Sequence, residues 1–342
     1  MAAPRSVRKR PLGNGGLSCF PIGLGCVPLS GVYGATDDAS GIRLIHRAFE
    51  LGVDLLDTAH MYGMGHNEVL VGKALAGGKR KGVIVSTKFG QYYPPKGVPR
   101  TDGMPDYVPI IDGRPEHVMQ SAEESLRKLS ISEIDLFYAH RIDPKVPIED
   151  TVGAMKRLVE QGKVRALGLC EARPETIKRA HGVHPIAAVQ MEFSLLFQAE
   201  AQEVRQTTRE LGIALVAYSP LARSLLTGTV RAGDQLADAR GRFPVFAKEN
   251  IATNLSYVEQ MAPIAREKGC TLAQLVLAWL LAQGDDVIPI PGTTKIPRLE
   301  ENLGAVDVHL TPSEVARLSA IVPAEGAAGE RYPREQMSAL NH

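Results

Sequence analysis

The amino-acid sequence predicts an α/β protein, a (β/α)8 or TIM barrel with an N-terminal β-hairpin and long loops at the carboxyl face of its sheet. Short β-branched runs alternate with amphipathic helical stretches, which is typical of parallel βα units. The chain has 342 residues, and such a barrel commonly needs about 250. No repeat, low-complexity tract or linker divides it, so we expect a single domain over residues 1–342.

The first predicted element is a hairpin over residues 8–21. At its centre, Asn14 and Gly15 are residues that tolerate the positive φ angles of a tight primed turn. Apolar runs then follow that we expect to be the barrel strands, at residues 22–26, 53–59, 83–89, 134–140, 164–170, 187–192, 213–219 and 287–292.

Amphipathic helices are expected between these strands. Residues 115–130 are one example, because their apolar positions recur at helical spacing: Val118, Ala122, Leu126 and Leu129. Two long segments, residues 90–114 and residues 220–250, fall outside the alternation. Both follow the carboxyl ends of predicted strands, where TIM barrels build their active sites. Long connections in a compact domain are usually lids or binding loops, so we expect both to border a functional site.

The charge balance limits the partners that this chain can have. Lys and Arg number 39 and Asp and Glu number 38, so no net field attracts nucleic acid or an anionic membrane. The longest apolar run, residues 272–282, is shorter than the ~20 residues that a membrane span needs. We therefore expect a small-molecule partner, no nucleic acid and no membrane. The sequence does not indicate an oligomeric state.

Cysteine usage indicates the compartment. The four cysteines are scattered without a C-x-x-C pair: Cys19, Cys26, Cys170 and Cys270. Free thiols in a reducing compartment are the simplest interpretation, and we expect a cytoplasmic protein. Residues 1–10 are basic but lack the apolar run of a secretory signal. This Arg-rich start leaves import into an organelle open.

Polar residues end or follow three neighbouring strands, and each should project into the same mouth of the barrel: Asp57, Tyr62, Lys88 and His140. Taken singly, each has an ordinary structural interpretation. In that interpretation the aspartate would cap a turn, the lysine would be a solvated strand end, and the tyrosine and histidine would have structural roles. Their convergence on one face favours a functional interpretation.

The chemistry explains why these residue types belong together. Hydride addition to a carbonyl creates an alkoxide that must be protonated, and a phenol is a suitable acid. An ammonium ~4 Å from the phenol oxygen stabilises the phenolate by about 4 kcal/mol at an effective dielectric constant of ~20, before desolvation is counted. Asp57 would keep Lys88 charged and oriented, and a neutral His140 would orient the carbonyl oxygen. This scheme needs no metal.

The motifs around these residues resemble those of the aldo-keto reductase family. They are D-T-A-H-M-Y-G at residues 57–63, S-T-K at 86–88 and H-R-I-D at 140–143, with further matches at 168–172, 190–194, 217–221 and 291–302. The match covers nearly the whole chain in the family's order. Within the family, the chain is similar to the bacterial and plant branch that includes auxin-induced-protein-like reductases.

The resemblance implies an NADPH-dependent carbonyl reductase, an alcohol dehydrogenase (NADP+) type of oxidoreductase. It implies that Gln190 holds the nicotinamide carboxamide and that Tyr218 stacks on the nicotinamide ring. It also implies a pyrophosphate path and an adenosine site, formed respectively by Ser219, Pro220, Leu221 and Arg223, and by Thr293, Thr294, Arg298, Glu301 and Asn302.

Two positions depart from the family's pattern. Cys170 and Glu171 stand where many relatives have Ser-Asn or Ser-Glu beside the carboxamide, and a thiol is a weaker hydrogen-bond partner than a hydroxyl. Gly292 stands where the mammalian branch carries a lysine, which weakens the case for NADPH. The remaining residues still support it, because the Gly-Thr-Thr turn leads into a helix N-terminus that attracts phosphate. Arg298 can grip a 2′-phosphate by two bonds; the alternative is a solvated helix start.

Three other features of the sequence are weaker signals. Residues 23–28 (G-L-G-C-V-P) nearly match a dinucleotide fingerprint but lack its third glycine and a following helix. His60 and His66 flank Tyr62 without metal-ligand spacing. Trp279 lies in an apolar helix and is expected to be a core residue.

The alternative function is a cofactor-binding sensor or auxiliary subunit with little turnover, which the resemblance does not exclude. A carbon–carbon double-bond reductase, associated in the family with glutamate at the position of His140, is disfavoured. Aromatic and apolar residues near the site favour an apolar or aromatic carbonyl compound, or else pack the lid itself: Met61, Phe89, Tyr92, Tyr93 and Tyr107. The physiological substrate is not indicated.

Overall fold

The structure is a computed structural model that describes residues 7–93, 108–234, 236–337 and 339–340. Its main sheet holds parallel strands in the order β12-β11-β10-β9-β8-β5-β4-β3. Their bounds are β3 Leu24–Gly25, β4 Leu55–Asp57, β5 Ile84–Phe89, β8 Ile134–Ala139, β9 Val164–Cys170, β10 Ile186–Glu192, β11 Ala214–Tyr218 and β12 Val287–Pro289. Each lies within a run that the sequence predicts, except that β10 begins one residue earlier.

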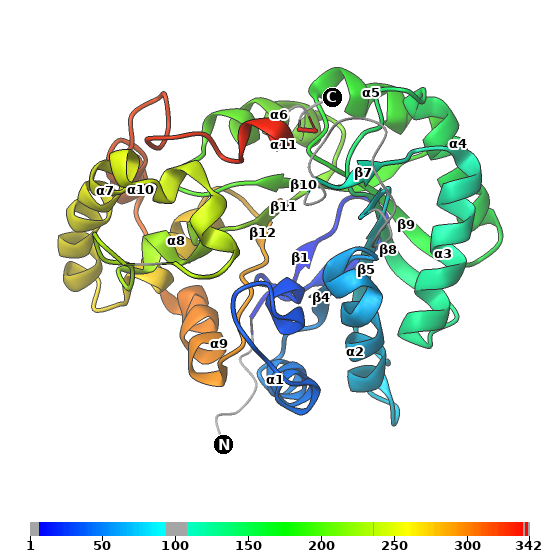
Figure 1. Ribbon diagram of the computed structural model, residues 1–342, viewed down its shortest axis with the longest axis horizontal. Helices are drawn as coiled ribbons and strands as arrows, with labels where there is room; N and C mark the ends of the chain where they lie inside the picture. The colour runs from blue at the N-terminus through cyan, green and yellow to red at the C-terminus, as the bar shows by residue number, and fades with distance from the viewer. Residues whose placement is uncertain (1–6, 94–107, 235, 338, 341–342) are drawn as a thin grey trace.

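Backbone hydrogen bonds close the sheet into a barrel. The amide of Gly23 donates to the carbonyl of Pro289 at 3.0 Å, and the amide of Gly25 donates to the carbonyl of Pro291 at 3.2 Å. These bonds join the two outermost strands of the sheet, β3 and β12. The predicted (β/α)8 barrel is therefore confirmed, and Figure 1 shows the helices arranged around it.

Helices follow the strands of the sheet along the chain, one after each strand up to β10 and more than one after each of the last two strands. They are α1 Asp38–Glu50, α2 His66–Leu75, α3 Pro115–Leu129, α4 Ile148–Glu160, α5 Pro174–Val183, α6 Ala199–Glu210, α7 Lys248–Glu267, α8 Leu272–Leu281, α9 Ile296–Leu303, α10 Pro312–Ser319 and α11 Arg334–Met337. In α3 the four apolar residues at helical spacing are all buried, as expected. Within the described chain, no helix combines the length and apolarity needed to cross a membrane.

A small hairpin covers the amino-terminal end of the barrel. It pairs β1 Arg10–Pro11 with β2 Ser18–Cys19 in antiparallel fashion. Its apolar residues Leu12 and Leu17 join the barrel interior, which includes Leu136 and Tyr138. The hairpin therefore closes the amino-terminal end of the barrel. The carboxyl ends of the strands lie at the opposite end.

The turn of this hairpin differs from the predicted primed turn, so that prediction is wrong. The amide of Leu12 bonds to the carbonyl of Leu17, which leaves a four-residue loop. Its positive φ angles lie at Gly13 (67°) and Gly16 (77°), not at Asn14 and Gly15. The reason is a tertiary contact, because a Cβ at Gly13 would lie 2.3 Å from the carbonyl oxygen of Ala187.

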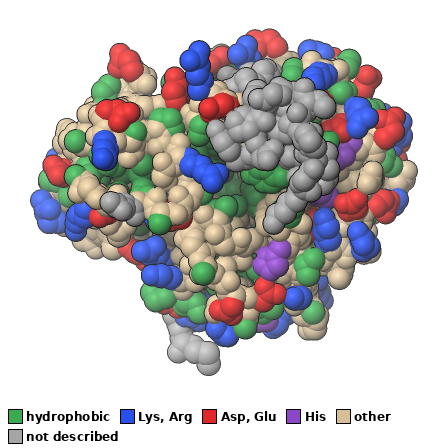
Figure 2. Space-filling view, in the orientation of Figure 1, with side chains coloured by type: hydrophobic (Ala, Val, Ile, Leu, Met, Phe, Trp, Pro, Cys, Tyr) green, Lys and Arg blue, Asp and Glu red, His purple; other side chains and the backbone are tan. Residues whose placement is uncertain are grey.

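The two long segments contain short elements of their own. The first begins and ends in a hairpin of β6 Gln91–Tyr92 and β7 Ile110–Ile111, and its central residues lie outside the described part of the chain. The second holds the 3-10 helices η3 Ala222–Thr227, η4 Ala239–Arg242 and η5 Pro244–Phe246 before α7 begins. Three further 3-10 turns are η1 Val27–Ser30, η2 Tyr62–Gly65 and η6 Gly304–Asp307. Figure 2 shows charged side chains of both signs interspersed over the face of the molecule in view.

Candidate active site

Asp57 and Lys88 form a buried ion pair at the carboxyl end of β4 and β5. The Lys88 Nζ lies 2.6 Å from Asp57 Oδ1 and donates a second bond of 2.8 Å to the carbonyl of Thr58. The other carboxylate oxygen of Asp57 accepts bonds of 2.8 Å from Ser86 Oγ and Gln190 Nε2. Because β4 and β5 pair with Asp57 opposite Ser86, Lys88 extends two residues past that register, next to the carboxylate.

Tyr62 follows β4 at the start of η2, and its hydroxyl meets the ammonium. Lys88 Nζ donates to the Tyr62 Oη at 3.3 Å and lies 4.9 Å from the centre of its ring. An ammonium has no acceptor, so the phenol oxygen must accept this bond. The hydroxyl proton of Tyr62 is therefore left free to be donated elsewhere.

His140 follows β8 and faces the same point. Its ring packs edge-on against the Tyr62 ring, with 5.8 Å between the ring centres. Its amide donates to the carbonyl of Phe89 at 2.9 Å, which continues the pairing of β8 with β5. Burial, with the positive charges of Lys88 and Arg141, holds the pKa of His140 well below its ordinary value of 6.5. The imidazole is therefore neutral, as expected.

The structure supplies the effect of desolvation on Tyr62, which the sequence argument leaves uncounted. Burial raises the pKa of Tyr62 to about 12, and the Lys88 ammonium only partly opposes it. Burial alone would lower the pKa of Lys88, but the Asp57 carboxylate and the neighbouring phenol hold it above its ordinary value. Desolvation thus outweighs the ammonium's effect on the phenol. The resting site has a protonated tyrosine and a charged lysine.

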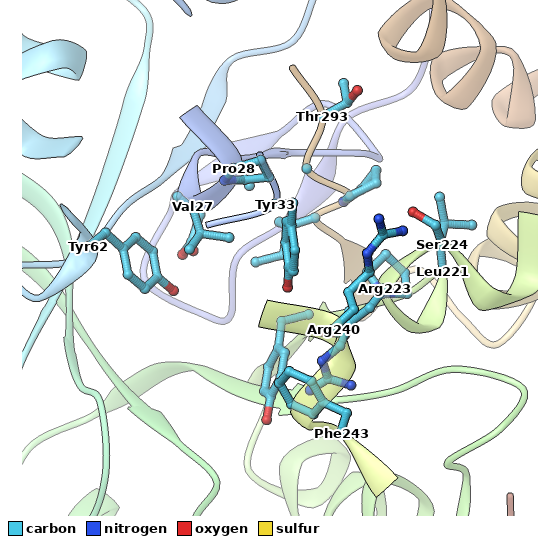
Figure 3. Close-up of a pocket in the computed structure, with 18 of the residues that line it drawn as sticks. Val27, Pro28, Tyr33, Tyr62, Leu221, Arg223, Ser224, Arg240, Phe243 and Thr293 are labelled. Atoms are coloured by element: carbon cyan, nitrogen blue, oxygen red, sulfur yellow. The ribbon is translucent and has the colours of Figure 1, made fainter. Parts of the chain in front are cut away.

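A cavity of about 400 Å³ opens above these residues. Of the predicted site residues, those that line it are Asp57, Tyr62, His140, Gln190, Tyr218, Ser219, Pro220, Leu221, Arg223, Gly292, Thr293, Thr294, Arg298, Glu301 and Asn302. Figure 3 shows Tyr62 at one side of this cavity and Leu221 and Ser224 across from it. The cavity therefore joins the tyrosine to the start of α9.

The loop after β11 supplies one wall of the cavity in an unusual backbone conformation. Four of its described non-glycine residues have positive φ angles: Ser219 (48°), Ala222 (45°), Arg223 (55°) and Ser224 (78°). Each such residue costs on the order of 1 kcal/mol or more, and strain of this kind concentrates at ligand sites. Successive turns of this type also present backbone amides to anions. The loop therefore suits the predicted pyrophosphate path.

The structure explains why residue 292 is a glycine, which the sequence does not reveal. A Cβ at this position would lie 2.7 Å from the carbonyl oxygen of Gly25 and 2.8 Å from Pro28 Cδ. A lysine cannot enter here without displacing the loop after β3. The following turn leads into α9, whose N-terminus carries no side-chain cap, as an anion site requires.

Two predicted cofactor contacts lie outside the cavity lining. Cys170 is buried in the barrel interior, where burial raises the pKa of its thiol to about 12. Glu171 is also buried, and its carboxylate accepts bonds from Tyr218 Oη at 2.8 Å and from Arg331 at 2.9 Å. Glu171 therefore contacts Tyr218 from outside the cavity, and its ion pair with Arg331 links Tyr218 to the C-terminal segment.

Further residues line the cavity that the sequence reasoning did not select. They are Gly25, Val27, Pro28, Tyr33, Gln91, Pro109, Arg141, Ser224, Thr227, Thr229, Arg240, Phe243, Ala273, Ile290, Pro291, Tyr332 and Gln336. Arg223 connects some of them, because its guanidinium lies 3.9 Å from the ring centre of Phe243 and 5.0 Å from that of Tyr332. Arg141 could have been selected from the sequence, because it lies within the H-R-I-D motif directly after His140. The C-terminal residues carry no local signal.

The aromatic residues proposed near the substrate separate into different environments. Met61 and Tyr93 line the cavity. Phe89 is buried against Phe137, with ring centres 4.9 Å apart, and Tyr92 packs on His117 at 5.5 Å. Tyr107 lies outside the described residues. Trp279 is fully buried, as expected for a core residue.

The residues present fit a nicotinamide dinucleotide. Tyr62 and His140 stand at one end of the cavity and a helix N-terminus with Arg298 at the other. In the described part of the chain, Arg298 has no carboxylate partner, so its guanidinium is available to a phosphate. Tyr218 offers an aromatic ring in the cavity wall between them.

Comparison with known proteins gives a consistent result. Residues 21–323 match the model of the Aldo/keto reductase family. The chain is 42% identical over 323 residues to a protein of Glycine max described as "Probable aldo-keto reductase 1", covering 94% of this chain and 90% of that protein.

Solved structures agree with this match. The glycerol dehydrogenase AKR11B4 from Gluconobacter oxydans has a TM-score of 0.82 and 28% identity, over 93% of this chain and 95% of that one. The holo form of the aldo-keto reductase AKR11C1 from Bacillus halodurans has a TM-score of 0.73 and 27% identity, over 93% of this chain and 97% of that one.

Proposed function

This chain belongs to the aldo/keto reductase family of oxidoreductases, and we propose that it reduces aldehydes or ketones to alcohols with NADPH, using Tyr62 as the general acid. The family implies carbonyl reduction with a nicotinamide cofactor. The proposal adds the proton donor and the choice of NADPH.

One observation carries the proposal: the phenol of Tyr62, the ammonium of Lys88 and the imidazole of His140 meet at one end of the cavity. The Asp57 carboxylate accepts a bond from the Lys88 ammonium and is itself fixed by bonds from Ser86 and Gln190. It therefore holds the lysine in place. Such support restricts the side chains to one geometry, as a proton-transfer site requires.

The residues of the chain divide the work of the reaction. NADPH, when bound, supplies the hydride. His140, neutral and beside Tyr62, donates a hydrogen bond to the substrate carbonyl oxygen and orients it. Tyr62 then transfers its free hydroxyl proton to that oxygen as negative charge develops there. The Lys88 ammonium, 3.3 Å from the phenol oxygen, stabilises the phenolate that remains.

The other end of the cavity supports the choice of NADPH. Arg298 and Lys295 stand at the start of α9, and Thr293 Oγ1 accepts a bond of 3.1 Å from the Lys295 amide that shapes the turn. A guanidinium holds a phosphate by two parallel bonds, which a ribose hydroxyl cannot match. The 2′-phosphate of NADPH would therefore be recognised here.

The variant Tyr62→Phe tests the assigned acid. We expect it to lose most reduction of a panel of aldehydes, measured as NADPH oxidation, because no other phenol bonds to Lys88 among the described residues. NADPH affinity, measured by fluorescence titration, should change by about twofold or less, since the hydroxyl is aimed at the substrate. Near-normal turnover in this variant would reject Tyr62.

The same panel separates the enzyme from the alternative function. A cofactor-binding sensor would bind NADPH tightly in its wild-type form and oxidise it with none of the aldehydes or ketones. Turnover that depends on Tyr62 would exclude that alternative.

A further inference from the structure

Four described arginines line the cavity, and their counter-ions divide them into two groups: Arg141, Arg223, Arg240 and Arg298. Arg223 is paired with Glu192 at 2.8 Å, and Arg240 is paired with Asp238 at 2.7 Å. Arg141 and Arg298 form no ion pair with any residue that the structure describes. Among the described residues, the cavity therefore has two cations without an ion-pair partner, Arg141 beside His140 and Arg298 at the start of α9.

Arg298 is accounted for by the 2′-phosphate under the proposed function, but Arg141 is not. Arg141 directly follows His140 in the chain, at the catalytic end of the cavity, and only 9% of its surface is exposed. Its Nη1 donates to the carbonyl oxygen of His140 at 2.7 Å. It makes no further hydrogen bond and no ion pair with a described residue, and it lines the cavity.

Glu171 is the carboxylate whose charge acts on Arg141, and it already has other partners. Its carboxylate accepts bonds from Arg331 at 2.9 Å and Tyr218 Oη at 2.8 Å, and from the Glu192 amide at 2.9 Å. Arg331 is the ion-pair partner of this carboxylate, and Arg141 interacts with it through space without a hydrogen bond or ion pair. The guanidinium of Arg141 therefore has no paired carboxylate among the described residues.

A nearly buried guanidinium without an ion-pair partner is unfavourable, because an ion that loses its hydration needs acceptors or an opposite charge in its place. Burial would lower the pKa of Arg141, yet Tyr218, Tyr332 and Glu171 hold it above its ordinary value, so the group stays charged. Its charge also contributes to the lowered pKa of the His140 imidazole, which requires the two groups to be near each other. An anionic ligand beside His140 would remove this cost.

We propose that Arg141 binds a carboxylate of the substrate, so that the preferred carbonyl compounds are oxo acids, which carry a carboxylate a few bonds from the aldehyde or ketone. This inference rests on the proposed function and specifies its substrate class. The carbonyl oxygen meets Tyr62 and His140, and the carboxylate meets the next residue along the chain. The planar guanidinium fork matches both oxygens of a carboxylate.

Matched pairs of an acid and a neutral analogue test the proposal. The substrates are para-carboxybenzaldehyde against its methyl ester, and succinic semialdehyde against butanal, each assayed by NADPH oxidation. The wild-type enzyme should show a higher kcat/KM for each acid. Arg141→Met, which keeps the length and removes the charge, should reduce the acid-to-neutral ratio about tenfold or more, as expected for a charge-assisted bond.

Two further variants complete the design. Arg141→Lys keeps the charge but loses the fork, and should retain part of the preference. Arg179→Met removes an exposed arginine that pairs with Glu149 at 2.6 Å on the outside of the barrel, and the ratio should be unchanged. Circular dichroism checks that each variant is folded.

A binding measurement on the wild-type enzyme makes the test independent of variant folding and of turnover. Calorimetry with NADP+-saturated enzyme, in which the phosphate site is filled, compares benzoate with benzamide. Benzoate should bind at least about tenfold more tightly.

Equal binding of benzoate and benzamide would overturn the proposal, as would an acid-to-neutral ratio that Arg141→Met leaves unchanged. If Arg141→Met instead weakens NADPH binding and lowers kcat/KM equally for acids and esters, the arginine serves the cofactor and the proposal is wrong. Failure of the proposed function looks different: wild-type enzyme would then oxidise NADPH with no carbonyl compound, ester or acid.

Discussion

Replacing Lys88 by methionine separates the two roles of the buried ion pair. The ammonium lies 3.3 Å from the Tyr62 oxygen, and at an effective dielectric constant of about 20 it stabilises a phenolate there by about 5 kcal/mol. At about 1.4 kcal/mol for each factor of ten, complete loss of this term slows proton transfer by about 10³- to 10⁴-fold. We therefore expect a loss of about a thousandfold in kcat/KM for para-nitrobenzaldehyde, because charge on the oxygen is only partly developed in the transition state.

The same variant should also unfold more easily. Lys88 is fully buried and Asp57 is 3% exposed, so Lys88→Met leaves a buried carboxylate with Ser86 and Gln190 as its remaining side-chain donors. Breaking a buried pair from one side typically costs about 3–5 kcal/mol. Urea unfolding followed by circular dichroism measures this cost. NADPH affinity should remain close to that of the wild type, because Lys88 does not line the cavity.

The double variant Asp57→Asn with Lys88→Met is the matched control. Removing both charges should restore much of the stability and none of the activity, since the uncompensated carboxylate is gone but the ammonium is still absent. Turnover in Lys88→Met within about tenfold of the wild type would refute the role assigned to the ammonium. A double variant as unstable as the single one would refute the electrostatic account of stability.

Three further predictions follow from the site. Gly292→Ala places a Cβ 2.7 Å from the Gly25 oxygen and should cost about 1–3 kcal/mol in urea unfolding, whereas Gly153→Ala in α4, where a Cβ meets open space, should be neutral or stabilising by about 0.5–1 kcal/mol; equal effects would contradict the contact. Arg298→Ala should raise KM for NADPH far more than for NADH, and a similar increase for both cofactors would remove the assigned 2′-phosphate contact. Because the pKa of Tyr62 is raised to about 12, its proton is fully present at lower pH and is lost as the pH rises through that value. Carbonyl reduction should then be insensitive to Tyr62 titration near neutral pH, while alcohol oxidation by NADP+ should rise with pH up to about 12, and a reduction profile that falls with an apparent pKa near neutrality would exclude a phenol with this pKa.

The cluster of candidate catalytic residues was predictable because Asp57, Lys88 and His140 lie at strand ends and Tyr62 follows in the turn after β4. Asp57, Lys88 and His140 lie at the carboxyl ends of β4, β5 and β8, and parallel strands in a barrel bring those ends together. Their side chains had to meet once the strands were identified. The glycine and threonine turn before α9 was equally readable, because it is a local feature.

Other features were not predictable, because they depend on contacts between distant segments. The turn residues of the hairpin were wrongly assigned, since the approach of Gly13 to Ala187 decides the loop. Arg331 is 160 residues from Glu171, and their ion pair brings the C-terminal segment to Tyr218. The raised pKa of Tyr62 was not predictable either, because the desolvation of its phenol depends on the surrounding cavity walls.

The sequence by itself determined the barrel, the identity of the four catalytic candidates and the end of the sheet on which they stand, because apolar periodicity and strand-end polarity are local properties of the chain. Only the tertiary structure decided which charges are compensated. Arg223 finds Glu192 and Arg331 finds Glu171, while Arg141 keeps its charge open to the cavity. Charge compensation is a property of distances in space, and residues far apart in the sequence set those distances.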